Sequence, residues 1–333
     1  MSGTDGLALA THGLRKNYGS RRALDGLDLA VPTGVVYGFL GPNGAGKTTT
    51  MRVLTGLIRA DEGTVEMLGR PFRRGDRRRL FEVGALIESP TFYPYLSARA
   101  NLRELASSGA PVPAKRIEEL LDLVGLCDRA NDQVQGYSMG MRQRLGIAAA
   151  LLSDPKLLLL DEPANGLDPA GIVAMRDTLK TLAGQGKTVV VSSHLLAEIQ
   201  VMADVVGIIA AGKLVREGQL KDLLAAEGVV KVRVEPGQVD AAVQALAPLA
   251  RAERLEETDR EEGWLAVHVP GDRTGEVSRM LATAGIYVLG LESGADLEML
   301  FLELTSGHSS GGSEGNFVGL GPTNGTTGKG TVA

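Results

Sequence analysis

The chain of 333 residues has little cysteine and few aromatic residues. Its single cysteine, Cys127, excludes an intramolecular disulfide and fits a reducing compartment. Because Cys127 lies in the apolar stretch LVGLCDRA, we expect a buried and unreactive thiol. Aromatic residues make up 4% of the chain, whereas its 44 glycines predict frequent tight turns and close approaches between backbone segments.

Long apolar runs are also missing. No stretch approaches the roughly 20 apolar residues that a helix needs to cross a bilayer. The N-terminal residues have no basic lead before their short, weakly apolar run, so they do not match a secretory signal. The formal net charge of −5 argues against a general nucleic-acid binder. If the protein serves a membrane, we expect it to act from outside the bilayer.

Short apolar runs in the first two thirds of the chain predict buried parallel strands. Helix-forming residues dominate about 95–152, and the segment AKRIEELLDLVG has apolar residues at helical spacing. Because strands alternate with helices, we predict an α/β domain over 1–220, with a helical subdomain at about 90–155. The predicted strands are 35–40, 157–160, 188–192 and 205–209.

The pattern changes near Gly228. The following residues predict the order β-α-β-β-α-β, which is typical of a small ferredoxin-like unit, and we assign 221–305 to an α+β accessory domain. The last strand of this unit is expected in IYVLGLE, and a final helix in ADLEMLFLELT. Residues 306–333 are rich in Gly, Ser and Thr, so we predict a disordered tail.

A phosphate-binding loop is predicted by GPNGAGKT, which lies between an apolar strand and a helix. Its glycines allow backbone N–H groups to surround a β-phosphate, Lys47 can reach the β- and γ-phosphates, and Thr48 can ligate Mg²⁺. A glycine-rich turn without function is the alternative, and the flanking strand and helix argue against it. The predicted phosphate-binding residues are Gly41, Pro42, Asn43, Gly44, Ala45, Gly46, Lys47, Thr48 and Thr49.

Two acidic residues follow the apolar run LLLL. Asp161 is expected at the carboxyl end of this strand, where it could hold Mg²⁺ through water. Glu162 is a candidate base, or orienting group, for an attacking water. With the phosphate-binding loop, these residues indicate a protein that hydrolyses or senses a nucleoside triphosphate.

The segment YSMGM, residues 137–141, precedes a helical pattern. Ser138 is suited to cap that helix, whose N-terminus could hold an anion. Residues 7–220 resemble the nucleotide-binding subunit of an ABC transporter, and YSMGM falls on the family signature Leu-Ser-Gly-Gly-Gln. Ser138 and Gly140 match the signature, and the other three residues depart from it. The resemblance implies that these two residues cap the γ-phosphate of ATP bound by a second subunit.

Other positions match the family in turn. Asp168 resembles the acidic residue of the loop that crosses the dimer interface, and His194 resembles the switch histidine that contacts the γ-phosphate and braces Glu162. Tyr18 resembles the aromatic residue that stacks on adenine. Glu88 stands where the family normally has a glutamine, so we expect it near Mg²⁺ and the attacking water.

The stretch IESPTFYPYL, together with YSMGM, resembles the bacitracin- and lantibiotic-resistance branch of the exporter ATPases, and ADLEMLFLELT resembles the closing helix of drug-exporter ATPases. This resemblance implies an ATPase with ATP and Mg²⁺ as cofactors. It would form a homodimer that powers a separate permease at the cytoplasmic face of the membrane and exports drugs, antibiotics or amphipathic peptides. Phe92, Tyr93, Tyr95 and Leu96 could dock the permease or could be local core.

Two other functions remain open. One is a soluble ABC ATPase that acts on nucleic acid or ribosomes; such proteins usually carry a long coiled coil or a second ATPase cassette, and this chain has neither. No nucleic-acid partner is expected. The other is a small-molecule kinase, which would leave Ser138, Asp168 and His194 unexplained.

Overall fold

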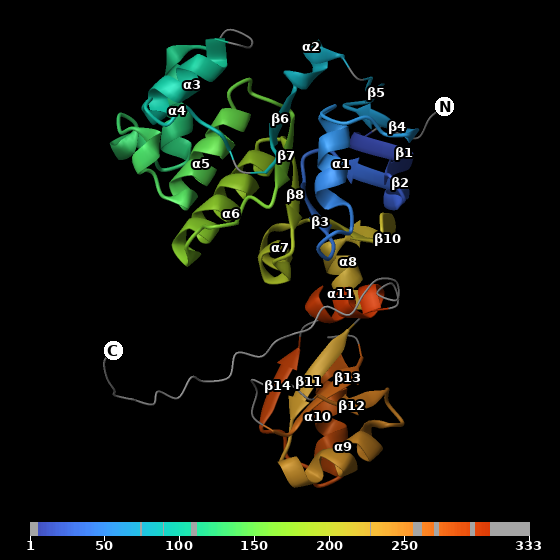
Figure 1. Cartoon of the computed structure of the whole chain (residues 1–333). Helices are drawn as coiled ribbons and strands as arrows, with labels where there is room; N and C mark the ends of the chain where they lie inside the picture. Colours follow the sequence, from blue (N-terminus) through green and yellow to red (C-terminus); the bar gives the residue numbers. More distant parts are fainter. Residues whose placement is uncertain are drawn as a thin grey trace, which may run out of the picture.

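The structure is a computed structural model. It describes residues 6–73, 75–88, 90–107, 112–226, 228–255, 262–269, 273–293 and 297–306. Figure 1 shows a large body with two sheets and several helices, and a small body formed by the last four strands with helices α9 and α10. The predicted tail lies, from residue 307 on, outside the described residues.

The central sheet of the large body has six strands in the order β10-β9-β3-β8-β7-β6. Five of them run parallel, and β10 is antiparallel to β9. All four strands predicted from apolar runs are present and lie side by side. The strands are β3 (Val36–Leu40), β6 (Val83–Leu86), β7 (Leu157–Asp161), β8 (Thr188–Ser193), β9 (Val205–Ala210) and β10 (Lys213–Gln219).

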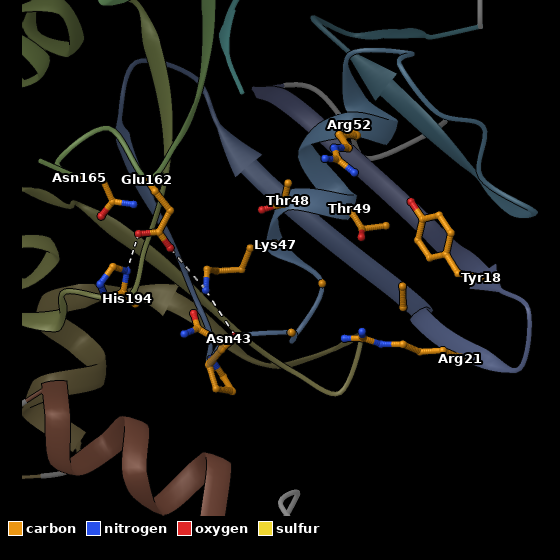
Figure 2. A pocket seen from close by; sticks show the side chains of 14 residues that line it. Tyr18, Arg21, Asn43, Lys47, Thr48, Thr49, Arg52, Glu162, Asn165 and His194 are labelled. Atoms are coloured by element: carbon orange, nitrogen blue, oxygen red, sulfur yellow. Dashed lines mark hydrogen bonds and ion pairs between the residues drawn. The ribbon is translucent and has the colours of Figure 1, made fainter. Parts of the chain in front are cut away.

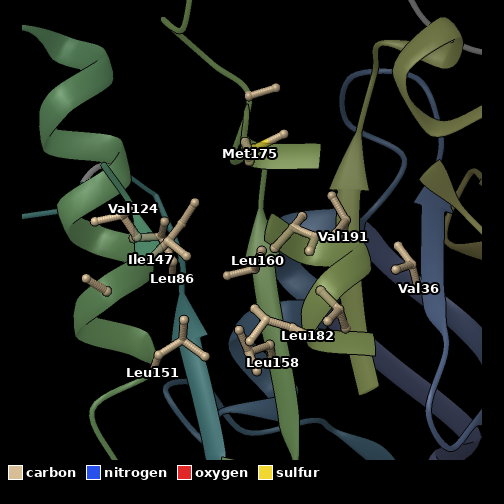
Figure 3. Packing of buried hydrophobic residues seen from close by; sticks show 14 of the residues in the cluster. Val36, Leu86, Val124, Ile147, Leu151, Leu158, Leu160, Met175, Leu182 and Val191 are labelled. Carbon is tan, nitrogen blue, oxygen red and sulfur yellow. The ribbon is translucent and has the colours of Figure 1, made fainter. Parts of the chain in front are cut away.

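Both faces of this sheet are buried, which explains why its strands are continuously apolar. On one face, residues such as Leu158, Leu160 and Val191 pack against the helices, as Figure 3 shows. On the other face, Leu157 and Leu159 pack with the second sheet and with α1. The helices on the first face are α3 (Ala98–Ser107), α4 (Ala114–Leu123), α5 (Met139–Ala150), α6 (Pro169–Gly184) and α7 (Leu196–Met202).

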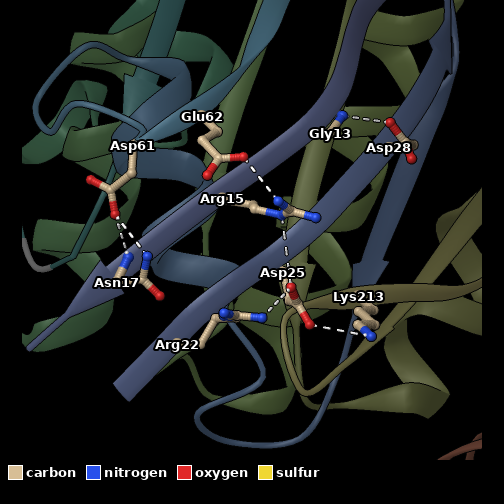
Figure 4. Close-up of polar contacts among 9 residues, drawn as sticks. All are labelled: Gly13, Arg15, Asn17, Arg22, Asp25, Asp28, Asp61, Glu62 and Lys213. Carbon is tan, nitrogen blue, oxygen red and sulfur yellow. Dashed lines mark hydrogen bonds and ion pairs between the residues drawn. The ribbon is translucent and has the colours of Figure 1, made fainter. Parts of the chain in front are cut away.

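The second sheet is antiparallel, in the order β2-β1-β4-β5, and helix α1 (Lys47–Leu54) lies between it and the central sheet. An ion pair joins this sheet to β10. Asp25 on β2 forms ion pairs with Arg22, at 2.9 Å, and with Lys213, at 3.2 Å (Figure 4). The hydrogen bond from Lys213, with the charge of Arg22, lowers the pKa of Asp25. The strands are β1 (Leu7–Tyr18), β2 (Arg21–Pro32), β4 (Glu62–Met67) and β5 (Arg70–Pro71).

Cys127 is exposed, so the prediction of a buried thiol is wrong. The chain leaves α4 through a turn at Gly125 and enters a short 3-10 helix, Cys127–Arg129. On this turn Val124 and Leu126 take the buried positions, and the next side chain points outward. The apolar residues around Cys127 in the sequence therefore do not enclose it. The helical subdomain otherwise follows the predicted pattern, with α3, α4 and α5 between residues 98 and 150.

The small body has the predicted β-α-β-β-α-β order and its own core. Its sheet order is β12-β13-β11-β14, and all pairs are antiparallel. The last strand begins at Gly290, later than predicted, because Ile286 instead turns into the core after Gly285. The elements are β11 (Val229–Arg233), α9 (Val239–Leu246), β12 (Ala252–Arg254), β13 (Trp264–His268), α10 (Thr274–Thr283) and β14 (Gly290–Ser293).

After β14 the chain returns to the large body. Helix α11 (Leu297–Ser306) packs against α7, and the backbone N–H of Leu297 donates a hydrogen bond to Gln200 Oε1 at 3.1 Å. Leu297 and Leu300 are buried in the core of the large body. A short helix α8 (Leu220–Ala226) links β10 to β11. Among the described residues, no helix is long and apolar enough to cross a membrane.

Candidate functional site

The loop from β3 to α1 is held close to the second sheet. A Cβ atom on Gly46 would lie 2.7 Å from the carbonyl oxygen of Ala23, and Gly46 has φ 115°. A Cβ atom on Gly41 would lie 2.5 Å from the carbonyl oxygen of Ile209. Both contacts are closer than real Cβ atoms come, so these positions require glycine. The loop is thus fixed with its backbone at the N-terminus of α1, where an anion is favoured.

Lys47, the first residue of α1, is buried beneath this loop. Its Nζ donates a hydrogen bond to the carbonyl oxygen of Gly41 at 2.6 Å and lies 3.7 Å from Glu162 Oε1. Burial lowers the pKa of Lys47, while the carboxylates of Glu162 and Asp161 act in the opposite direction. A cation is therefore held between the loop and the end of β7.

Ser192 joins the two acidic residues that follow the leucine run. Asp161 and Ser192 are paired in register on β7 and β8, and the Ser192 hydroxyl donates a hydrogen bond to Asp161 Oδ1 at 2.5 Å. The same hydroxyl accepts a hydrogen bond from the backbone N–H of Glu162 at 3.0 Å. Glu162 has φ 50°, a left-handed conformation that costs about 1 kcal/mol or more in a non-glycine residue. These bonds hold its side chain at the end of the sheet.

His194 lies one residue beyond β8 and faces Glu162. Its Nδ1 is 2.5 Å from Glu162 Oε2, while the other carboxylate oxygen faces Lys47. The structure therefore brings the predicted base and the predicted switch histidine together, from the ends of neighbouring parallel strands. Glu162 can orient a water molecule while His194 fixes its carboxylate.

These groups open into a cavity of about 590 Å³ (Figure 2). Gly41 and Ala45 are buried behind the loop, and Asp161 is buried beside Ser192. Arg21, Arg52 and Asn165 line the cavity although they were not predicted. The predicted residues that line it are Tyr18, Pro42, Asn43, Gly44, Gly46, Lys47, Thr48, Thr49, Glu162 and His194.

Glu88 does not itself line the cavity, but it contacts Arg52, which does. It lies after β6, has φ 66°, and forms an ion pair with Arg52 of α1. Arg52 lines the cavity, and its positive charge offsets the negative charge of Glu88 next to it. The spacing of Arg52 and Glu88 in the chain does not indicate this ion pair.

The signature segment lies outside this cavity, at the start of α5. Ser138 caps the helix as predicted, since its Oγ accepts a hydrogen bond from the backbone N–H of Met141 at 3.2 Å. Asp168 caps α6 in the same way through Gly171 N, at 3.0 Å. A Cβ atom on Gly140 would lie 3.1 Å from Leu167, so the two helix starts are neighbours.

Tyr137, the first residue of the segment YSMGM, is part of the core. Its ring is buried in the helical subdomain, and its hydroxyl donates a hydrogen bond to the carbonyl oxygen of Arg129 at 2.6 Å. The tyrosine therefore ties the signature segment to the preceding 3-10 turn. Met139, by contrast, is 51% exposed beside the capping serine.

The aromatic stretch before α3 divides between core and surface. Phe92 packs against the core, so the local-core interpretation holds for this residue. Tyr93 and Tyr95 are 59% and 75% exposed, and Leu96 is partly exposed. These exposed residues form an apolar surface on the helical subdomain, and none of them lines the cavity described above.

Comparison with known proteins gives one matching family model, described as ABC transporter, over residues 24–165. The bacitracin transport ATP-binding protein BcrA of Bacillus licheniformis is 38% identical over 308 residues, which span 91% of this chain and 99% of that protein. The daunorubicin resistance ATP-binding protein DrrA3 of Streptomyces coeruleorubidus is 39% identical over 285 residues, 84% of this chain and 89% of that protein.

Among solved structures, one is a dimeric ATP-binding cassette in a post-hydrolysis state with ADP and Pi. It matches with a TM-score of 0.58 and 26% identity, over 64% of this chain and 98% of that chain. The two relatives BcrA and DrrA3 confirm the resemblance to the bacitracin and drug-exporter branch. The predicted α/β fold of the large body is confirmed as well.

Proposed function

The chain belongs to the ATP-binding subunits of ABC transporters, and on this premise we propose that two copies hydrolyse ATP together to power a separate membrane permease. The family domain implies ATPase activity. One observation carries the assignment of the reaction to this cavity: Glu162 lies between Lys47 and His194 at its base. A carboxylate so placed can orient a water molecule towards a phosphate held by the loop.

The residues present fit ATP with Mg²⁺. The loop N–H groups and Lys47 hold phosphate oxygens, and Tyr18, which is 46% exposed at the cavity edge, offers a ring for adenine. The hydroxyl of Thr48 and the carboxylate of Asp161 are oxygen ligands of the kind that Mg²⁺ prefers. When bound, Mg²⁺ would neutralise charge on the phosphate oxygens. Glu88, held by Arg52, would adjust the charge beside the metal.

A second copy supplies what one chain lacks. Ser138 and Gly140 lie near the cap residue Asp168, and none of the three lines the cavity. We assign this surface to the γ-phosphate of ATP held by a second chain. Binding of ATP would then close the dimer, and hydrolysis would reopen it. The dimeric cassette of similar fold supports this arrangement.

The permease would dock on the helical subdomain, where Tyr93 and Tyr95 are exposed. It would hold the ATPase at the cytoplasmic face of the membrane. The related proteins named for bacitracin transport and daunorubicin resistance support export of drugs, antibiotics or amphipathic peptides. We assign the ATPase domain to 1–220, with its helical subdomain at about 90–155, and the accessory domain to 221–305, and we propose that residues 306–333 form a disordered tail.

The test is hydrolysis of ATP by the purified full chain with Mg²⁺. Glu162→Gln should retain ATP binding and abolish turnover, whereas Glu198→Gln, at a half-buried position of α7 that does not line the cavity, should hydrolyse ATP at the parental rate. If Glu162→Gln turns over ATP like the parent, the role of Glu162 is wrong.

The transport assignment has its own test. Affinity purification from membranes should recover a protein with several membrane-spanning helices. Recovery of nucleic acid or ribosomes in its place would support the alternative ABC ATPase that acts on those partners.

A further inference from the structure

Arg21 is a charged residue of the cavity to which no role has been given. It begins β2 and is paired in register with Tyr18 across the tight turn of the β1–β2 hairpin. This pairing places the two side chains at the same end of the cavity. Figure 2 shows the guanidinium of Arg21 extending from its strand towards the phosphate-binding loop, away from the ring of Tyr18.

The guanidinium lies over the loop itself. Its Nη2 would be 3.1 Å from a Cβ atom added at Gly44, which has φ 82°. An arginine at this distance from the loop is within reach of an anion that the loop amides bind. A planar guanidinium can donate two parallel hydrogen bonds to phosphate oxygens.

The charges around the cavity give a second, independent reason to expect that Arg21 binds an anion. Three cationic side chains line the cavity, and two of them have carboxylate partners: Lys47 faces Glu162, and Arg52 is paired with Glu88. Among the residues that the structure describes, the Arg21 side chain has no hydrogen bond and no ion pair. The nearby carboxylate of Asp25 is occupied by other cations.

We propose that Arg21 binds the phosphate chain of the nucleotide, as a further binding residue of the site assigned above to ATP. This inference rests on the proposed function. The contact is electrostatic and remote from Glu162, so it stabilises the bound nucleotide before and during hydrolysis alike. It therefore lowers KM and leaves kcat unchanged.

Arg22 provides a matched control. It is the next residue of the same strand, is exposed, and pairs with Asp25 at 2.9 Å instead of facing the cavity. The experiment measures displacement of a fluorescent ATP analogue from the full chain by ATP, ADP and AMP. It compares the parent with Arg21→Ala, Arg21→Lys, Arg22→Ala and Lys47→Ala, each checked for an unchanged melting temperature.

Arg21→Ala should weaken binding of ATP and ADP about tenfold and change AMP binding by less than about twofold, because a charged hydrogen bond to the outer phosphates is lost. Arg21→Lys should recover part of this loss, and Arg22→Ala should bind like the parent. Equal affinities for Arg21→Ala and Arg22→Ala would overturn the proposal, as would an equal loss for AMP, which would move the contact to the sugar or base.

Failure of the proposed function gives a different result. If the parent chain does not bind ATP, both the proposed function and the role of Arg21 are wrong. If the parent binds ATP, Lys47→Ala loses it, and Arg21→Ala matches Arg22→Ala, only the role of Arg21 is wrong.

Discussion

Replacement of Ser192 by alanine tests how the acidic end of β7 is held. Ser192 is fully buried, and its hydroxyl both donates to Asp161 and accepts from the backbone N–H of Glu162. Loss of a hydrogen bond to a charged group costs about 1.5–3 kcal/mol when the partner stays buried. With about 2–4 °C per kcal/mol for a domain of this size, Ser192→Ala should lower the melting temperature by roughly 3–12 °C.

Ser193→Ala is the matched control. Ser193 is buried on the same strand, but its hydroxyl accepts only the neutral backbone N–H of Leu195, at 2.9 Å. A neutral bond is worth about 1 kcal/mol, so the control should lose roughly 2–4 °C. The assay is thermal unfolding without nucleotide, followed by ATP hydrolysis, which Ser192→Ala should also impair because Glu162 is released. Equal losses of melting temperature in the two variants would show that the charged bond to Asp161 adds no stability beyond that of a neutral bond.

Two further predictions concern other contacts. Glu88→Gln should tighten ATP binding by up to about fivefold, because it removes a negative charge beside the cavity and frees Arg52 from an exposed pair worth about 0.2–1 kcal/mol; weaker binding in a titration would contradict this. Leu300→Ala should cost about 2–5 kcal/mol of unfolding free energy, because Leu300 is buried beneath α7. Leu289→Ala, at a position 51% exposed, should cost far less, and equal losses in denaturant titrations would exclude the packing of α11 as a source of stability.

Local sequence was enough to predict four of the six strands of the central sheet, all except β6 and β10, and the phosphate-binding loop. A strand buried on both faces has to be apolar throughout, so β7 and β8 could be found without knowledge of their neighbours. The loop could be found because its glycines and Lys47 must follow one another at fixed spacing. The small body was predicted from element order alone.

The site residues that the sequence did not indicate, and the exposure of Cys127, depend on how the chain folds in three dimensions. Ser192 faces Asp161 only because β7 and β8 are parallel neighbours in a particular register. In the sequence Ser192 is marked only by its place in a pair of serines, Ser192 and Ser193, at the end of an apolar strand. Arg21 and Arg52 reach the cavity from β2 and α1, and their spacing in the chain does not indicate a common site. The prediction of a buried Cys127 was wrong for the same reason, because the turn before it, and not the apolar residues around it in the sequence, decides its exposure.

In the proposed dimer each ATP is enclosed by two chains, with Ser138 and Gly140 of one chain facing the nucleotide of the other. Sedimentation of the Glu162→Gln variant with and without Mg-ATP tests it most directly. We expect a monomer without nucleotide and a dimer with saturating Mg-ATP, and the added change Gly140→Arg should abolish the dimer. A Glu162→Gln chain that binds Mg-ATP and still sediments as a monomer would contradict the claim.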